Sequence, residues 1–350
     1  MRTSTRRFFV PACLVVAIGL TAVAAPLPAR LSDQEFWRLV SESSEPDGTF
    51  RSDNLLSNEL GFQFVVPELT RTTKPGRVYM GVGPEQNFTY IVATKPAMAF
   101  IVDIRRGNLD LQLMYKALFE LSANRAEFVS RLFSKKRPDS LSARSTSSEI
   151  FGAFWNVATD AALFNENLQA IETLLAKKHA FAVSNDDLEG IKYVYNAFFQ
   201  YGPKIQYSST SSFGGSGQPS YADLMTAVDY AGLEHSYLAS EENFQFMKDL
   251  ETRNMLVPVI GNFGGPKAIR AVGKYLKERN AIVSAFYLSN VEQYLRQDLI
   301  WDNFCANVAT LPLDETSTFI RSVRRGNATP GIGLSSELGI MLSEVKGCRP

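Results

Sequence analysis

The alternation of apolar and polar positions predicts buried strands and helices in regular succession from residue 77 onward. Residues 77–83 form an apolar strand that runs into a glycine turn, and residues 86–94 form a short helix. Residues 98–103 are a continuous apolar run ending in a carboxylate, which is typical of a parallel strand buried on both faces. Together they predict a βαβ unit, covered by a long helix from residue 109 to about 121.

Helical periodicity replaces the strand pattern between residues 122 and 232. Two polar stretches, 140–148 and 208–218, interrupt it, so we expect a helical insertion with two loops. The second loop is long enough to act as a lid, although a disordered crossing is the commoner outcome for its composition.

Strands and helices alternate again towards the C-terminus. Ser240 is expected to cap a helix that runs to residue 252. The other predicted elements are strands at 236–239, 255–260 and 281–288, helices at 267–279 and 291–298, and a closing antiparallel pair at 304–311 and 317–323. About seven strands alternating with helices predict an α/β fold with a doubly wound, mostly parallel sheet and helices on both faces.

Residues 25–76 precede this α/β domain. Ser32 is expected to cap a short helix over residues 32–43, and Glu35 completes a capping box. Residues 44–57 are polar and turn-rich, which predicts a surface segment leading to the core. The chain therefore divides into an N-terminal helix and surface segment at 25–76 and an α/β domain at 77–350, with the helical insertion at about 122–232.

Residues 1–24 have the zones of a signal peptide. Arg2, Arg6 and Arg7 precede an apolar run at 11–23, which is shorter than the roughly 20 residues of a membrane span, and cleavage is expected after Ala24. Residues 5–10 resemble the twin-arginine export signal of bacteria, which carries folded proteins. We therefore expect a periplasmic or secreted protein without a membrane span after signal removal. Ordinary secretion and an uncleaved membrane anchor are the alternatives.

Charge and cysteine content restrict the partners. The chain has 36 basic and 36 acidic side chains, so its charge gives no reason to expect nucleic acid as a partner. Signal removal leaves Cys305 and Cys348, which either form a disulfide, as export would allow, or are one buried thiol and one thiol on a loose tail. Two histidines and two cysteines, far apart in sequence, give no zinc signature, so no metal is expected.

Five segments are predicted to meet where the strands end, which is where open α/β sheets bind ligands. They are residues 81–87, 103–106, 240–243, 261–265 and 289–290. Gly81 and Gly83 allow a ligand to approach the backbone, and Asp103, 22 positions after Gly81, stands where a carboxylate would accept hydrogen bonds from ribose hydroxyls. Glu85 disfavours a phosphate at this turn and favours an amine, and S-adenosylmethionine combines adenosine with an amine.

This order of strand, Gly-x-Gly turn, helix and acid-terminated strand resembles the class I S-adenosylmethionine-dependent methyltransferases. More narrowly, the chain resembles an uncharacterised bacterial family of methyltransferase-like proteins over residues 79–90, 99–106, 221–226 and 261–294. The resemblance implies S-adenosyl-L-methionine as a cofactor and a cofactor-binding set of Gly81, Gly83, Glu85, Gln86, Asn87, Asp103 and Asn262. It identifies no catalytic residue, because the turn at Asn262 lacks the Asn-Pro-Pro-aromatic or Asp-Pro-Pro-aromatic motif of many such enzymes.

Four of these candidate residues also have a purely structural interpretation. The glycines would serve a tight turn, Asp103 would pair with Arg105 or cap the next helix, and Asn262 would cap a helix. The functions that remain are a methyltransferase-like enzyme, a non-catalytic exported protein that binds a small polar or nucleoside-like ligand, and a nicotinamide oxidoreductase. Gln86, in place of the third glycine of a dinucleotide fingerprint, contradicts the last of these.

Overall fold

The computed structural model describes residues 25–210, 217–323 and 334–349. The predicted signal peptide, residues 1–24, lies outside these ranges, and so does the centre of the predicted loop at 208–218. The export signal, its twin-arginine character and the lid therefore stay predictions.

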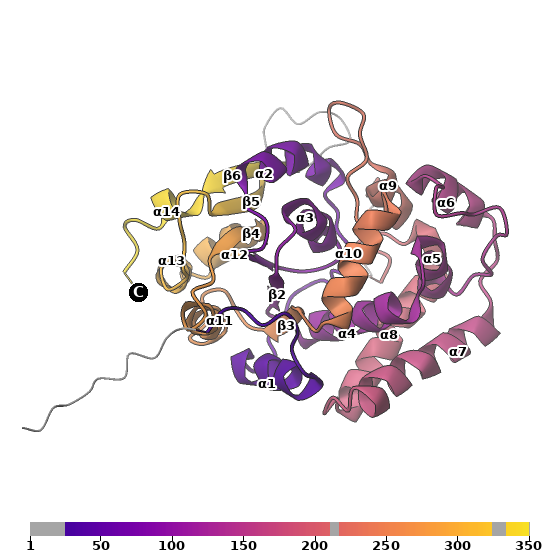
Figure 1. The fold of residues 1–350 in the computed structure, drawn as a ribbon, viewed down its shortest axis with the longest axis horizontal. Helices are drawn as coiled ribbons and strands as arrows, with labels where there is room; N and C mark the ends of the chain where they lie inside the picture. Colours follow the sequence, from indigo (N-terminus) through magenta and orange to yellow (C-terminus); the bar gives the residue numbers. More distant parts are fainter. Residues whose placement is uncertain (1–24, 211–216, 324–333, 350) are drawn as a thin grey trace, which may run out of the picture.

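Over the described residues, a six-stranded sheet organises the α/β domain, in the order β3-β2-β1-β4-β5-β6 (Figure 1). Its first five strands are parallel and the last, at the edge, is antiparallel. The strands are β1 (Val78–Gly81), β2 (Met98–Asp103), β3 (Leu256–Ile260), β4 (Val283–Ser289), β5 (Thr318–Val323) and β6 (Ser335–Ile340). The prediction of a doubly wound, mostly parallel α/β sheet is confirmed. Strand order reverses next to β1, between β2 and β4.

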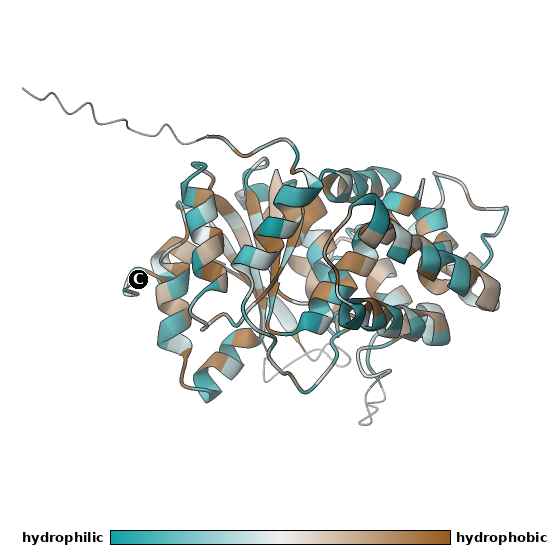
Figure 2. Ribbon diagram, turned by 90° about the horizontal axis from the view of Figure 1, so that it is seen from below, coloured by the Kyte–Doolittle hydropathy of each residue, from teal (hydrophilic) through white to brown (hydrophobic). Residues whose placement is uncertain are grey.

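Helices cover both faces of the sheet, which explains why its central strands are apolar throughout. All residues of β1, β2 and β3 are buried. In Figure 1, α3 (Gln86–Thr94), α4 (Arg106–Leu121) and α10 (Glu241–Thr252) lie on one side, and α1 (Asp33–Ser43), α11 (Ala268–Lys277) and α13 (Trp301–Val308) lie on the other. Figure 2 shows the hydrophobic residues concentrated on the strands between these two layers.

The predicted helical insertion packs outside α4. Its elements are α5 (Arg125–Phe133), α6 (Ser147–Trp155), α7 (Ala161–Glu172), η2 (Thr173–Lys178), α8 (Asn185–Tyr201), η3 (Gly202–Lys204) and α9 (Tyr221–Thr226). α8 lies directly against α4, where Gly190 leaves room for the carboxylate of Asp110: a Cβ at Gly190 would stand 2.2 Å from its Oδ2.

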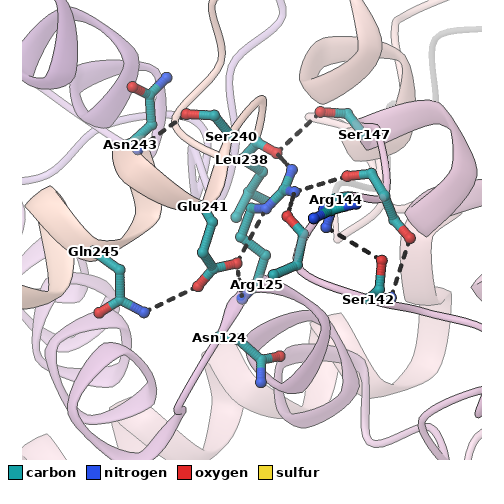
Figure 3. Close-up of polar contacts among 12 residues, drawn as sticks. Asn124, Arg125, Ser142, Arg144, Ser147, Leu238, Ser240, Glu241, Asn243 and Gln245 are labelled. Atoms are coloured by element: carbon teal, nitrogen blue, oxygen red, sulfur yellow. Dashed lines mark hydrogen bonds and ion pairs between the residues drawn. The ribbon is translucent and has the colours of Figure 1, made fainter.

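The strand predicted at 236–239 is wrong. The side chain of Arg125, 2% exposed, enters this segment and donates from Nη1 to the carbonyl of Leu238, at 2.7 Å. Ser147 Oγ donates to the same carbonyl, at 3.0 Å (Figure 3). The second guanidinium nitrogen reaches the carbonyls of Ala143 and Ser145. This buried arginine thus joins the insertion to the segment before α10 and to Glu241 in its first turn.

The predicted closing pair is half wrong. Residues 317–323 do form a strand, β5, but residues 304–311 belong largely to the helix α13. Phe304, Val308 and Leu311 are all buried and spaced by four and three, which is a helical repeat. The antiparallel partner of β5 is instead β6, a polar edge strand, so the sheet has six strands and not about seven.

The N-terminal region is more buried than predicted. The helix α1 and its capping box of Ser32 and Glu35 are confirmed. However, the segment after it is not only a surface segment, because Leu55 and Leu56 are buried. Two unpredicted helices follow, η1 (Leu60–Val65) and α2 (Val66–Thr72).

The C-terminal segment is tied to α13 by a disulfide between Cys305 and Cys348, whose Cα atoms are 5.3 Å apart. The structure thus selects the disulfide from the two alternatives for these cysteines. The described part of the chain also contains α12 (Val291–Gln297), as predicted, and a short α14 (Met341–Glu344). In the part of the chain that the structure describes, no helix is both long and apolar enough to cross a membrane.

Candidate functional site

A cavity of about 770 Å³ lies at the carboxyl ends of β1, β2, β3 and β4. The strand-end segments 82–84, 103–105, 261–263 and 287–291 line one part of it, and residues 49–59 of the N-terminal region line another. Tyr207, Ser208, Gln218 and Leu334 also contribute. Four of the five predicted segments therefore meet here, at the position where strand order reverses. Sheets of this kind bind ligands at such positions.

The segment at 240–243 does not line this cavity. Ser240 caps α10 by accepting from the amide of Asn243, at 3.1 Å. The preceding segment is bound to Arg125 through the carbonyl of Leu238 and forms no strand, and none of residues 240–243 lines the cavity. The prediction for this segment is wrong.

The turn between β1 and α3 is fixed by Asn87. Its Nδ2 donates to the carbonyls of Val82 and Pro84, at 2.8 and 2.7 Å, and its Oδ1 accepts from the hydroxyl of Tyr79. Gly81 makes this possible, since a Cβ there would stand 1.8 Å from Asn87 Oδ1. Neither Gly81 nor Asn87 is among the residues that line the cavity. Both residues fix the shape of the turn without lining the cavity.

Gly83 does line the cavity and has a φ of +77°, a conformation that favours glycine. Its carbonyl accepts from Nε2 of Gln112, at 3.0 Å. No atom lies within 4 Å of a Cβ built at this position. Backbone conformation, rather than a close neighbour, therefore explains glycine here.

The side chains of Glu85 and Gln86 lie in different surroundings. Glu85 is fully buried outside the cavity lining, and burial raises the pKa of its carboxyl to about 8, even though the amide of Ser57 donates to Oε1. Gln86 lines the cavity, accepts from the hydroxyl of Ser57 and donates to Glu59 Oε2 at 2.9 Å. Glu85 is thus not placed to receive the predicted amine from a ligand in this cavity.

Asp103 lines the cavity at the end of β2 and is bound to Arg105. Its Oδ1 accepts from the amide of Arg105, at 2.9 Å, and Oδ2 lies 3.4 Å from the guanidinium Nη2. Arg105 Nη1 also donates to the carbonyl of Asp53. The pairing considered as an alternative for Asp103 is therefore present, although a carboxylate has four acceptor positions and keeps capacity for a ligand.

Asn262 lines the cavity in the turn after β3, where its Oδ1 accepts from the amide of Gly264 at 2.9 Å. The helix cap at this turn is provided by Glu45. Its Oε1 accepts from the amides of Lys267 and Ala268, at 2.8 and 2.9 Å, and its Oε2 from the amide of Asn262. A carboxylate from the N-terminal region thus occupies the start of α11.

The main residue that the sequence did not reveal is Glu59. It lines the cavity, is 3% exposed, and accepts at Oε1 from the hydroxyls of Tyr287 and Ser289, both at 2.8 Å. Burial, with a smaller contribution from the charge of Glu59, holds the pKa of Tyr287 well above its ordinary value. Tyr287 and Glu59 are 228 positions apart, so no local pattern could have paired them.

The charged side chains that line the cavity are of both signs. They are Arg51, Glu59, Asp103, Arg105 and Asp298. Among the described lining residues there is no lysine, histidine or cysteine. Over the described ranges there is also no group of three or more His, Cys, Asp or Glu side chains placed to hold a metal ion.

The sequence matches the family model whose description is Domain of unknown function (DUF7790), over residues 55–152 and 149–336. No curated protein matches the sequence.

Proposed function

The chain belongs to the DUF7790 family, and because the family description states no function, we propose one from the cavity: binding of S-adenosylmethionine or S-adenosylhomocysteine. The proposed binding mode is that of a methyltransferase-like protein, with the ribose at the end of β2. The observation that carries the proposal is the meeting of Gly83, Asp103 and Asn262 around one cavity at the reversal of strand order.

The size and lining of the cavity support a ligand of this kind. Its volume of about 770 Å³ is within the range of small-molecule sites. Apolar side chains, among them Ile104, Phe263 and Leu295, alternate with polar ones around it. Asn54 is one of the lining residues, and its buried Oδ1 has no hydrogen-bond partner in the described structure. Since buried polar atoms are normally paired, this oxygen is available to a ligand donor.

Asp103 is the residue proposed to accept from the ribose hydroxyls. Its contact with Arg105 orients the carboxylate and supplies a neighbouring positive charge, while leaving acceptor positions on both oxygens. Gly83 presents backbone without a side chain at the neighbouring turn. S-adenosylmethionine would supply an activated methyl group there, and the residues described so far would bind and orient it.

Binding without methyl transfer is the second candidate, and the lining itself supports it. The described lining residues include no histidine, lysine or cysteine, the side chains that most often move a proton near neutral pH or act as nucleophiles. In addition, Asp103 and Asn262 are already hydrogen-bonded to the protein. Export to a periplasmic or extracellular location belongs to this proposal, and the Cys305–Cys348 disulfide supports it, since disulfides persist in such compartments.

Calorimetry on the mature chain tests the proposal. Both adenosyl compounds should bind the wild-type protein, and Asp103→Ala should weaken them about ten- to a hundredfold, the effect of losing hydrogen bonds worth about 1.5–3 kcal/mol. Asp314→Ala is the matched control, because Asp314 also pairs with an arginine, Arg77, but outside the cavity lining. The absence of heat with either compound at millimolar concentration would refute adenosyl binding.

Gly83 is unsuitable for a blocking mutation, although a larger side chain there would approach the ligand. With a φ of +77°, any side chain strains the turn itself. A loss of binding in Gly83→Val would therefore report the backbone and the ligand together. Asp103 separates the two effects better.

A further inference from the structure

Glu59 shares with Glu85, Asp110 and Glu251 the lack of an ion pair in the described structure, but it alone of the four lines the cavity and has hydrogen bonds at both carboxylate oxygens. It is 3% exposed and accepts hydrogen bonds from three neutral groups: the Tyr287 and Ser289 hydroxyls at Oε1 and the Gln86 amide at Oε2. In the described part of the chain, no lysine, arginine or histidine lies within 4.0 Å of its carboxylate oxygens. Its hydrogen bonds are satisfied, whereas its charge has no counter-ion.

Asp187 and Glu120 show that the fold can also compensate a carboxylate of low exposure with a cation. Asp187, which is fully buried, lies 2.5 Å from Nε of Arg106. The carboxylate of Glu120, whose side chain is 7% exposed, lies 2.9 Å from the ammonium of Lys116. Burying a charge is costly unless a counter-charge compensates it. A cation carried by a ligand would therefore compensate Glu59, which lines the cavity and has no cation partner among the described residues.

The surroundings of Glu59 in the cavity fit an organic cation. Besides Tyr287, the cavity is lined by the aromatic residues Phe50, Tyr207 and Tyr294. Carboxylate and aromatic faces together are the environment in which proteins bind ammonium and similar cations. Of the two lining arginines, Arg105 is paired with Asp103, and the exposed Arg51 is hydrogen-bonded to the Tyr294 hydroxyl. The charge of Arg105 is therefore compensated by Asp103, and that of the exposed Arg51 is screened by water.

We infer that Glu59 binds the positively charged group of the cavity's ligand, an ammonium or sulfonium carried on a small organic molecule. For S-adenosylmethionine that group is the sulfonium, and to this extent the inference rests on the proposed function. It also stands without it, because any small organic cation would satisfy the same carboxylate. Tyr287, Ser289 and Gln86 hold the carboxylate in place, and the ligand supplies the missing charge.

Two pairs of ligands that differ in charge test the inference by calorimetry and thermal shift. The first pair is S-adenosylmethionine and S-adenosylhomocysteine, of which only the former has a sulfonium. The wild-type protein should prefer it at least about tenfold, and Glu59→Gln should bring the two affinities close together by weakening S-adenosylmethionine. Asp298→Asn is the control: this exposed carboxylate lines the same cavity but is screened by water, so the preference should persist.

The second pair, tetramethylammonium and its neutral analogue tert-butanol, separates this inference from the adenosyl proposal. Only the cation should raise the melting temperature of the wild type, and Glu59→Gln should lose that increase. If neither adenosyl compound binds but this pattern holds, the adenosyl proposal fails and the cation site stands. Equal affinities for both adenosyl compounds in the wild type would overturn the assignment of the sulfonium to Glu59, because the ammonium is common to both compounds, and so would an unchanged preference in Glu59→Gln. Equal responses of the wild type to the second pair would overturn the cation site itself. The wild-type preferences decide the matter if Glu59→Gln does not fold.

Discussion

The cavity has two walls, one formed by the strand-end turns and the other by the N-terminal segment at 45–59, and they are held in place in different ways. The strand-end turns are held by hydrogen bonds between near neighbours, such as Asn87 with Val82 and Asp103 with Arg105. The N-terminal segment at 45–59 is held by partners far away in sequence. Glu45 binds the turn after β3, 217 positions on, and Glu59 binds Tyr287, 228 positions on.

This difference means that the turns determine the shape of the cavity, whereas the N-terminal segment is expected to recognise the charge of a ligand. In the turns, polar side chains predicted to bind a ligand, such as Asn87 and Asn262, are hydrogen-bonded to the backbone and fix its form. The N-terminal segment instead supplies a buried carboxylate that no cation of the described protein neutralises. Specificity for charge is therefore expected from the segment, and a stable platform from the turns.

The largest effect is expected from breaking a turn. Gly81→Ala would place a Cβ 1.8 Å from Asn87 Oδ1 and 3.0 Å from Tyr79. Asn87 is buried and fixed by three hydrogen bonds, so it cannot move aside without leaving buried polar groups unpaired. We expect a loss of about 3 kcal/mol in the free energy of unfolding, measured by urea denaturation.

Gly107→Ala is the matched control for Gly81→Ala. Gly107 is exposed within α4, and no atom lies within 4 Å of a Cβ built there. Alanine should leave stability unchanged or raise it by about 0.5–1 kcal/mol, because glycine is a poor helix residue. A loss in Gly81→Ala no larger than that in Gly107→Ala would show that the turn is not rigid.

A smaller effect is expected from detaching the N-terminal segment. Glu45→Ala removes a carboxylate that accepts from the amides of Asn262, Lys267 and Ala268. We expect a loss of about 2 kcal/mol in unfolding free energy, together with faster amide hydrogen exchange over residues 45–59. Glu42→Ala, at an exposed position of α1, should change stability by no more than about 0.5 kcal/mol. Unchanged exchange in Glu45→Ala would mean that other contacts hold the segment.

The same difference between the two walls explains which parts of the structure could be predicted from the sequence. The β1 turn, the end of β2 and the Ser32 capping box were predictable, because apolar runs, glycines and cap residues follow one another locally. The polar edge strand β6 and the helix α13 were not predicted, the first for lack of an apolar pattern and the second because its helical spacing was taken for a strand.

The candidate site was predicted only in its local part. Gly83, Gln86, Asp103 and Asn262 do line the cavity. Glu59 was missed, because it follows a polar stretch and finds its partners only through the tertiary fold. The role predicted for Glu85 illustrates the same limit: its acidity was visible in the sequence, whereas its burial was not.

The effect expected from Glu85 depends on pH and is about 1 kcal/mol for each pH unit. Burial raises the pKa of this carboxyl to about 8 from its ordinary 4.5. Between pH 4.5 and 8 the carboxyl is therefore protonated in the folded protein and ionised in the unfolded chain. The protonated carboxyl contributes stability below about pH 4.5, and that contribution declines as pH rises and is lost above about pH 8. The decline has a slope of at most about 1.4 kcal/mol per pH unit.

Glu85→Gln removes the titration and keeps the size of the side chain. Relative to the wild type, its free energy of unfolding should therefore rise by about 1 kcal/mol per pH unit between about pH 5 and 8, measured by denaturation across that range. Asp110 and Glu251, whose pKa values burial also raises to about 8, titrate in both proteins and cancel in the difference. Glu42→Gln, at an exposed position, should show no such trend. If the difference between Glu85→Gln and the wild type were independent of pH, Glu85 would be ionised in the folded protein, and the wall formed by the turns would hold an uncompensated charge just as the N-terminal segment does.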